Sequence, residues 1–249
     1  MLAPLIRLAD TAYRAGLPLM SDAAFDHLVR LAPNALPPIT TALLSLDCNP
    51  EPEDWLERHP GPYAVQLKAD GVSVNLVYED GRLSHAHLRS GRDCTHAAIR
   101  AGALLDLPGS PVGRIEIRCE AIGSLAAPQQ NGHATKPPTR NAVAAALRRK
   151  GMEDNVQLSL LAFDIVGIDA ITTQIGALTW LRCAGFATLD CLEATTPTEV
   201  MQLFDAFCLA QHTLPFACDG LTVKLNSKIQ QRQLGNDSRC PRWAISLKP

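Results

Sequence analysis

Lys68 stands at a position where its side-chain amine could act as a nucleophile. Lys68 is followed by Ala69, Asp70 and Gly71, with alternating apolar residues on both sides. A lysine at the end of a strand, held by a tight Asp-Gly turn, points into the cavity that the sheet forms. Its amine attacks phosphorus only when neutral, so a working site must lower the pKa of this amine with nearby cations or a metal. A surface turn after a strand fits the same residues, because so short a match recurs by chance.

The hydrophobic periods around this lysine predict the elements that position it. Apolar residues alternate over 63–67 and 72–78, which predicts two strands, and the sequence Glu-Asp-Gly at 79–81 predicts a hairpin turn. Further strands are predicted at 114–121, 156–165 and 219–225, and helices at 141–149, 173–184 and 197–211. Strands and helices do not alternate regularly, so the expected fold class is α+β, with mixed, largely antiparallel sheets and flanking helices.

The start of the chain is expected to form a small helical appendage over residues 1–34. Ser21 and Asp22 can cap a helix over 23–31, and a linker follows at Pro33, Pro37 and Pro38. Residues 35–249 are then the main domain.

Composition restricts the class of protein. No apolar stretch approaches the roughly 20 residues that span a bilayer, and the N-terminus does not have the pattern of a secretory signal. Eight cysteines without a C-x-x-C pair argue against structural zinc and against disulfides, and favour a reduced, cytoplasmic protein. The net charge of −2 predicts only weak binding of nucleic acid by this chain alone. A monomer is expected.

Several segments, in order along the chain, resemble the covalent nucleotidyltransferases, and in particular the NAD⁺-dependent bacterial DNA ligases. The segments are Lys68 with Asp70-Gly71, IEIRCEA at 115–121, Thr139-Arg140-Asn141-Ala142 with Arg148, LLAFDIVG at 160–167, LPFACDGLTVKLNS at 214–227, and Pro241-Arg242-Trp243-Ala244 with Lys248. The resemblance implies an ATP-grasp-like nucleotidyltransferase domain. It also implies that Lys68 takes AMP from NAD⁺ and releases nicotinamide mononucleotide (NMN).

The resemblance further implies a role for each matched residue. Catalytic roles fall on Lys68, Asp70, Glu120, Lys224 and Lys248, and a Mg²⁺ or Mn²⁺ ion is expected at Glu120 and Asp219, with no zinc. Contacts to the nucleotide are expected from Ser45, Leu46, Gln66, Leu67, Gly71, Arg89, Arg118, Arg140, Arg148 and Phe163, the last by stacking on adenine. An exposed hairpin arginine also fits Arg89, and a buried strand edge also fits Ser45 and Leu46.

The appendage bears on which nucleotide is used. Tyr13, Asp22, Phe25 and Asp26 resemble the element that holds the NMN half of NAD⁺ in these ligases. Carboxylates and an aromatic ring suit the cationic nicotinamide. Taken alone, the two aspartates also fit the first turn of a helix, where acids are favoured.

The sequence departs from the ligase pattern in several places. Gln66 replaces a glutamate that reads the adenine amino group, a contact that the Gln66 carbonyl oxygen could still accept. Gln211 replaces an arginine, the appendage is compressed, and Phe25 replaces a tyrosine. We expect no counterpart in this chain of the OB-fold, zinc module, helix-hairpin-helix and BRCT regions of these ligases. We therefore expect self-adenylation, with nicked DNA bound weakly or through the missing regions.

Two other functions remain open from the sequence. The same scaffold could transfer AMP to RNA ends or to another protein. It could also be a non-catalytic module that binds NAD⁺, since Gln66 and Gln211 alter the site.

Overall fold

The computed structural model describes residues 51–123, 138–148, 156–236 and 240–249, together with a few isolated residues before position 51 that include Leu46. The strands are β1 Tyr63–Ala69, β2 Val72–Glu79, β3 Arg82–Leu88, β4 Arg114–Gly123, β5 Leu158–Val166, β6 Cys191–Ala194, β7 Cys218–Leu225 and β8 Ala244–Leu247. The helices are α3 Pro52–Arg58, α4 Thr95–Arg100, α5 Arg140–Arg148, α6 Gln174–Cys183, α7 Pro197–Ala210 and α8 Lys228–Leu234, with a 3₁₀ turn at Gln211–Thr213. None of these helices has the length and apolarity needed to cross a bilayer.

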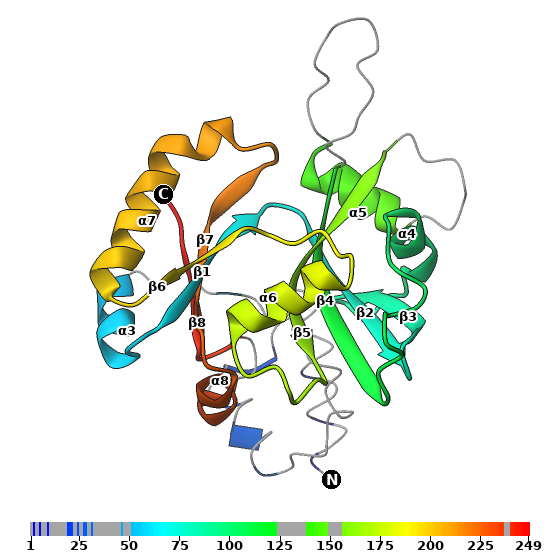
Figure 1. The fold of residues 1–249 in the computed structure, drawn as a ribbon, viewed down its shortest axis with the longest axis horizontal. Helices are drawn as coiled ribbons and strands as arrows, with labels where there is room; N and C mark the ends of the chain where they lie inside the picture. The colour runs from blue at the N-terminus through cyan, green and yellow to red at the C-terminus, as the bar shows by residue number, and fades with distance from the viewer. Residues whose placement is uncertain are drawn as a thin grey trace, which may run out of the picture.

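The strands form two antiparallel sheets that lie side by side (Figure 1). The first sheet has the order β6-β1-β7-β8 and the second the order β3-β2-β4-β5. The chain leaves the first sheet at Ala69 and enters the second at Val72. The segment that carries Lys68, Asp70 and Gly71 is therefore the crossing between the two sheets.

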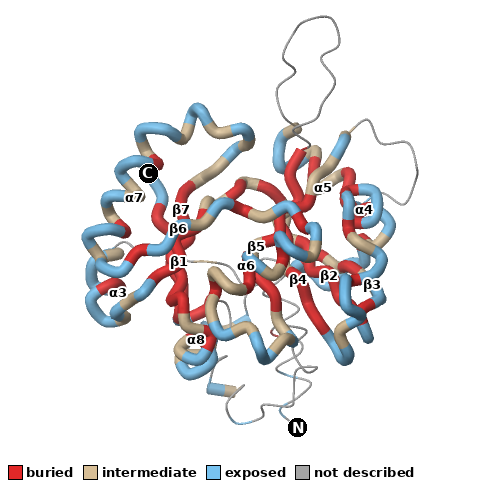
Figure 2. The backbone as a smooth tube through the Cα atoms, viewed as in Figure 1, coloured by how far each residue is buried: buried red, intermediate tan, exposed pale blue. Residues whose placement is uncertain are grey.

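Each sheet buries one face under helices. Apolar residues of β1, β7 and β8 pack with α3 and α7, including Val65, Val223 and Leu247. In the second sheet Val74 and Ile117 belong to a core that α4, α5 and α6 complete. Buried residues follow the strands of both sheets (Figure 2). Between the sheets lies a smaller apolar cluster, which joins Ala69 of the first sheet to Ile122 and Leu161 of the second.

The elements predicted over residues 63–225 are present, with bounds that shift by one or two residues at most of their ends. The α+β class with antiparallel sheets is confirmed. The hairpin turn is present, with positive φ at Asp80 and Gly81. Helix α7 begins at its predicted cap, where the Thr196 side chain accepts from the Glu199 backbone N–H. The elements that were not predicted, β3, β6, β8, α3, α4 and α8, are mostly too short to show a hydrophobic period.

The appendage prediction, and its boundary at residue 34, fall on a part of the chain of which only isolated residues are described. Both remain predictions.

Gly220 allows β7 and β8 to approach closely. A Cβ added at Gly220 would lie 2.0 Å from the Leu247 carbonyl oxygen. We expect Gly220→Ala to lower the free energy of unfolding by roughly 2–3 kcal/mol, because the strands must separate locally. Urea unfolding measures the loss. Gly235→Ala is the control, since Gly235 has a φ of +65° but open space around its Cβ position, and an equal loss in both variants would show that the close approach is unimportant.

Candidate active site

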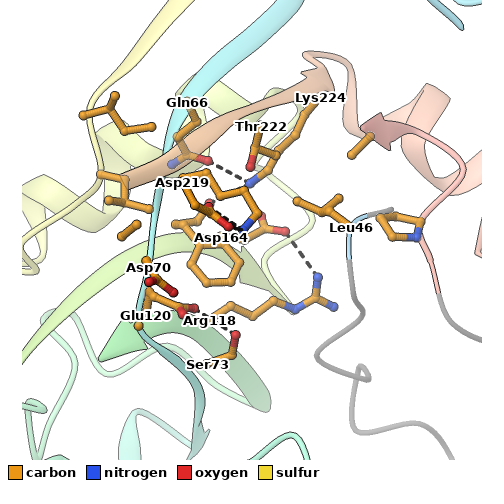
Figure 3. A pocket seen from close by; sticks show the side chains of 18 of the residues that line it. Leu46, Gln66, Asp70, Ser73, Arg118, Glu120, Asp164, Asp219, Thr222 and Lys224 are labelled. Atoms are coloured by element: carbon orange, nitrogen blue, oxygen red, sulfur yellow. Dashed lines mark hydrogen bonds and ion pairs between the residues drawn. The ribbon is translucent and has the colours of Figure 1, made fainter. Parts of the chain in front are cut away.

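A cleft of about 240 Å³ lies between the two sheets at their crossing (Figure 3). Its walls come from β1, β7 and β8 on one side and from β2, β4 and β5 on the other. The predicted site residues that line it are Leu46, Gln66, Leu67, Lys68, Asp70, Gly71, Arg89, Arg118, Glu120, Arg140, Phe163, Asp219, Lys224 and Lys248. Residues from distant parts of the sequence therefore meet around Lys68.

Gly71 explains why the turn after Lys68 is tight. A Cβ at this position would lie 2.2 Å from the Ala121 carbonyl oxygen and 3.0 Å from Glu120 Cγ. Only glycine lets the crossing segment pass this close to β4. The end of β1 is thus held against the strand that carries Glu120.

Lys68 and Lys248 share one carboxylate. Lys68 Nζ lies 2.7 and 3.0 Å from the two oxygens of Asp219, and Lys248 Nζ lies 3.0 Å from Oδ2. Burial by itself raises the pKa of Asp219, but the hydrogen bonds and charges of the two lysines outweigh it and lower this pKa. Asp219 is therefore ionised at neutral pH and holds the Lys68 amine at the cleft.

A β-bulge directs Asp219 toward Lys68. Lys68 pairs with Gly220 and Ala69 with Cys218, so Asp219 is the additional residue on β7. Such an extra residue leaves the strict alternation of the strand and re-aims its side chain. The contact between Lys68 and Asp219 depends on this irregularity.

Glu120 lies on the opposite wall of the cleft. Its Oε2 accepts a hydrogen bond of 2.8 Å from Ser73 Oγ. Burial raises the pKa of Glu120 to about 7, and this rise is only partly offset by Ser73 and by the charges of Lys68, Arg140 and Arg89. The carboxylate is therefore unusually ready to take up a proton or a cation near neutral pH.

Glu120 suits a magnesium ion better than Asp219 does. Among the residues that the structure describes, no three His, Cys, Asp or Glu side chains gather into a complete metal site. Mg²⁺ does not need such a set, because it commonly binds one or two carboxylates, water and substrate phosphates. A desolvated carboxylate with a raised pKa gains from a cation, whereas the charge of Asp219 is already balanced by two lysines. The donor set thus fits an ion held by Glu120 and a bound phosphate.

If Glu120 holds the ion, protons should compete with magnesium for it. We expect the apparent affinity for Mg²⁺ to fall by about tenfold for each pH unit below about 7, because the neutral carboxyl binds no cation. Nucleotide adduct formation, measured against magnesium concentration from pH 5.5 to 8, reports this affinity. Glu120→Gln should flatten the dependence, and Glu57→Gln on the exposed side of α3 should leave it unchanged. A magnesium requirement that is the same across this range contradicts the assignment.

Lys224 is buried deep in the cleft. Its Nζ donates to Gln66 Oε1 at 2.9 Å and to the Phe163 carbonyl oxygen at 3.1 Å, and lies 5.2 Å from the centre of the Phe163 ring. Burial lowers the pKa of Lys224 to about 8, although the charge of Asp164 opposes this shift. The ammonium thus remains largely protonated at pH 7. Gln66 Oε1 accepts from Lys224 and keeps a second lone pair, so the expectation that this oxygen also reads an amino group stays a prediction.

Asp164 is a cleft residue that the sequence reasoning missed. Its Oδ1 accepts from Lys228 Nζ at 2.6 Å, and its Oδ2 lies 3.5 Å from Arg118 Nη1. Lys228 also donates to Gln174 Oε1 at 2.7 Å. Burial opposes ionisation of Asp164, but the charges of Lys228, Lys224 and Arg118 together lower its pKa far below the usual range. Asp164 is thus a buried anion that balances the positive charges of Lys228, Lys224 and Arg118.

A second β-bulge, between β4 and β5, explains why the sequence did not predict Asp164 as a cleft residue. Arg118 pairs with Asp164 and Cys119 with Ala162, so Phe163 is the additional residue on β5. Both Phe163 and Asp164 consequently line the cleft, although strict alternation would send them to opposite faces.

The predicted arginines differ in position. Arg140 lies 3.7 Å from Asp70 at the mouth of the cleft, and Arg89 and Arg118 also line it. Arg148 is not brought to the cleft. It lies at the exposed end of α5, where its Nε donates to the Ala144 carbonyl oxygen of the same helix.

Other predicted positions lie away from the cleft or outside the described residues. Tyr13, Asp22, Phe25, Asp26 and Ser45 lie outside the described residues, so their roles remain predictions. Gln211 lies in the 3₁₀ turn and lines an apolar groove under α7, not the cleft. Further cleft residues not predicted as contacts are Ala69, Ser73, Leu189, Thr222, Pro241, Trp243 and Ala244. Thr222 lies two residues before Lys224 on β7 and therefore on the same face. Ser73 of β2 pairs with Glu120 of β4. Alternation along a strand and pairing across strands could have identified these two residues.

Comparison with known proteins identifies the family. Residues 53–249 match the NAD-dependent DNA ligase adenylation domain. A DNA ligase of Corynebacterium aurimucosum is 34% identical over 221 residues, which cover 80% of this chain and 33% of that protein. A DNA ligase of Psychrobacter arcticus is 32% identical over 207 residues, 75% of this chain and 29% of that protein.

A solved structure named "Pmar-Lig_PreS3" has the same fold. It aligns with a TM-score of 0.59 at 13% identity, over 93% of this chain and 51% of that one. The chain spans about a third of the length of the curated relatives that it matches. The match over residues 53–249 shows that this chain belongs to the NAD-dependent DNA ligase adenylation domain family.

Proposed function

We propose that this chain transfers AMP from NAD⁺ to its own Lys68. The observation that carries the proposal is the meeting of one amine, held by Asp219, with three further cleft groups, Glu120, Lys224 and Lys248, in a chain of this family. Cations that converge on one cleft are suited to an anionic phosphate. A lysine that faces them is suited to attack it.

The reaction is an in-line exchange at phosphorus. The neutral Lys68 amine forms an N–P bond with the α-phosphate, and the bond from phosphorus to the bridging oxygen breaks. The electron pair of that bond leaves with the phosphate of NMN, and a phosphoramide of AMP remains on Lys68. Asp219, 2.7 Å from Nζ, is positioned to accept the proton that the attacking nitrogen loses.

The other cleft residues bind and orient the phosphate. Lys224 has used two of its three N–H donors on Gln66 and Phe163, so one donor is directed elsewhere. Lys248 is shared with Asp219 and lies beside the amine. A magnesium ion, when bound at Glu120, would add positive charge against the phosphate oxygens. Phe163 offers a ring at the cleft wall on which a purine can stack.

The proposal is tested by looking for a covalent AMP adduct on the protein. The purified chain, incubated with NAD⁺ and MgCl₂, is expected to gain the mass of one adenylyl group and to release an equal amount of NMN. Peptide mapping should find the adduct on Lys68, and hydroxylamine or acid should cleave it as a phosphoramide. Tight NAD⁺ binding in calorimetry without any adduct would instead select a non-catalytic binding module.

The proposed acceptor of the AMP is the 5′-phosphate of a nick in DNA, as the names of the relatives suggest. The net charge of −2 supports weak binding of DNA by this chain alone. The isolated Lys68 adduct, mixed with nicked duplex at low salt, should transfer AMP to the 5′-phosphate slowly. The same adduct offered 5′-phosphorylated RNA is the comparison, and faster discharge there would select the other acceptor.

A further inference from the structure

The side-chain amide of Gln66 has a fixed orientation. Gln66 lies on β1 opposite Thr222 of β7, and only 1% of its surface is exposed. Its Oε1 accepts from Lys224 Nζ at 2.9 Å. An ammonium group can only donate, so the amide cannot rotate to present nitrogen to Lys224. The pKa of Lys224, about 8, keeps this ammonium largely protonated at pH 7.

The Gln66 amide nitrogen is therefore turned away from Lys224 (Figure 3). Nε2 is buried and has no hydrogen-bond partner among the described residues. A buried donor without an acceptor costs about 1–3 kcal/mol, and Gln66 lines the cleft. A ligand that fills the cleft and carries an acceptor at this point would remove the cost.

The surroundings of Gln66 identify the part of the ligand concerned. Phe163, Leu46 and Leu189 line the same cleft and supply an aromatic ring and apolar side chains. Lys68 is two residues along the same strand, on the same face as Gln66. If a nucleotide binds with its purine base beside Phe163 and its phosphate at Lys68, one edge of the base would lie next to Gln66. The amide nitrogen then meets the base.

We propose that Gln66 determines the specificity for the base by donating from Nε2 to an acceptor on the purine edge, so that the site takes 6-oxopurine dinucleotides as well as NAD⁺. This inference rests on the proposed function. Adenine has an amino donor at C6, which an N–H donor cannot pair with, and offers only its ring nitrogens. Hypoxanthine has a carbonyl oxygen at C6, which accepts directly from Nε2.

The experiment compares NAD⁺ with nicotinamide hypoxanthine dinucleotide. The two differ in the base alone, and the rate of NMN release with each gives a ratio of efficiencies at pH 7. The wild-type protein is expected to use the hypoxanthine dinucleotide within about tenfold of NAD⁺, since one hydrogen bond typically shifts such a ratio by about tenfold. Discrimination against hypoxanthine by more than a hundredfold would overturn the inference.

Gln66→Glu is the decisive variant. The carboxylate can keep one oxygen on Lys224 and presents a second acceptor to the base, so the hypoxanthine-to-adenine ratio should fall at least tenfold. Gln66→Met removes both polar atoms of the side chain, and its hypoxanthine-to-adenine ratio should lie between those of the wild type and Gln66→Glu. Gln233→Glu makes the same charge change on the exposed side of α8 and should leave the ratio unchanged. An unchanged ratio in Gln66→Glu refutes the role of Gln66.

A failure of the chemistry can be separated from a failure of this inference. If neither dinucleotide gives an adduct, the proposed function is wrong. The ratio of the two dissociation constants, measured by calorimetry on the wild-type and Gln66→Glu proteins, then decides the inference by the same criterion.

Discussion

Lys68→Arg is expected to abolish the covalent nucleotide adduct while the protein stays folded and still binds NAD⁺. Arginine remains protonated at any working pH and has no free electron pair to attack phosphorus. It can nevertheless keep the ion pair with Asp219, whose oxygens lie 2.7 and 3.0 Å from Lys68 Nζ. The expected loss is roughly 10⁶-fold in the rate of adduct formation, the scale on which an enzyme responds to removal of its nucleophile. Intact-protein mass measurement after incubation with NAD⁺ and magnesium gives the result.

Two controls make this result specific to the amine. Calorimetry should find NAD⁺ binding in the variant close to that of the wild type, because binding does not need a neutral amine. Arg82→Lys makes the reverse exchange at an exposed position of β3, where the side chain is 87% accessible, and should leave the adduct unchanged. A Lys68→Arg protein that still gains the adenylyl mass would mean that another residue is the nucleophile.

Asp164→Asn is expected to give the largest loss of stability among the single changes considered. Asp164 is 2% exposed and is the acidic partner of Lys228 and Arg118. Removal of its charge leaves these buried cations uncompensated, which costs about 3–5 kcal/mol when one member of a buried pair is lost. Urea unfolding at pH 7 measures this loss. Asp169→Asn, on the exposed turn after β5, is the matched control and should change the free energy of unfolding little.

The stability lost in Asp164→Asn should depend on pH in one direction. The pKa of Asp164 is lowered in the folded protein from 3.8, so its ionised form stabilises the fold at every pH above that value. This contribution declines as the pH falls below 3.8 toward the lower folded pKa. The difference between wild type and Asp164→Asn should therefore be constant from pH 7 to about 4 and narrow below it. A difference that grows in acid would contradict the assignment.

Lys228→Met offers a further check on the network. Alone it removes the cation 2.6 Å from Asp164 Oδ1 and leaves the carboxylate with Arg118. Combined with Asp164→Asn, it should cost less than the sum of the two single losses, because the double variant no longer buries this unbalanced pair. Strict additivity would mean that Asp164 and Lys228 do not act together.

Sequence alone predicted the elements with strong local signals. β1, β2, β4, β5 and β7 show alternating or continuous apolar residues, and α7 has a capping box, so each could be placed within a few residues. Short elements such as β6 and β8, of four residues each, carry no period and take their form from β1 and β7, with which they pair. Their existence is decided by the neighbouring strand.

The candidate site divides in the same way. The sequence by itself singled out Lys68 as the candidate nucleophile, the glycine of its turn and the order of the charged residues, because these depend on residue type and on spacing along one strand. Only the tertiary structure decided that Asp219 pairs with Lys68, that Asp164 enters the cleft and Arg148 stays outside it, and that the Gln66 amide nitrogen is left without a partner among the described residues. Each depends on contacts with residues distant in sequence: bulges arise from the register between two strands, and the orientation of Gln66 arises from Lys224, 158 residues away. Alternation along a chain cannot encode a register shift against a partner strand, so these features appear only when the strands are paired.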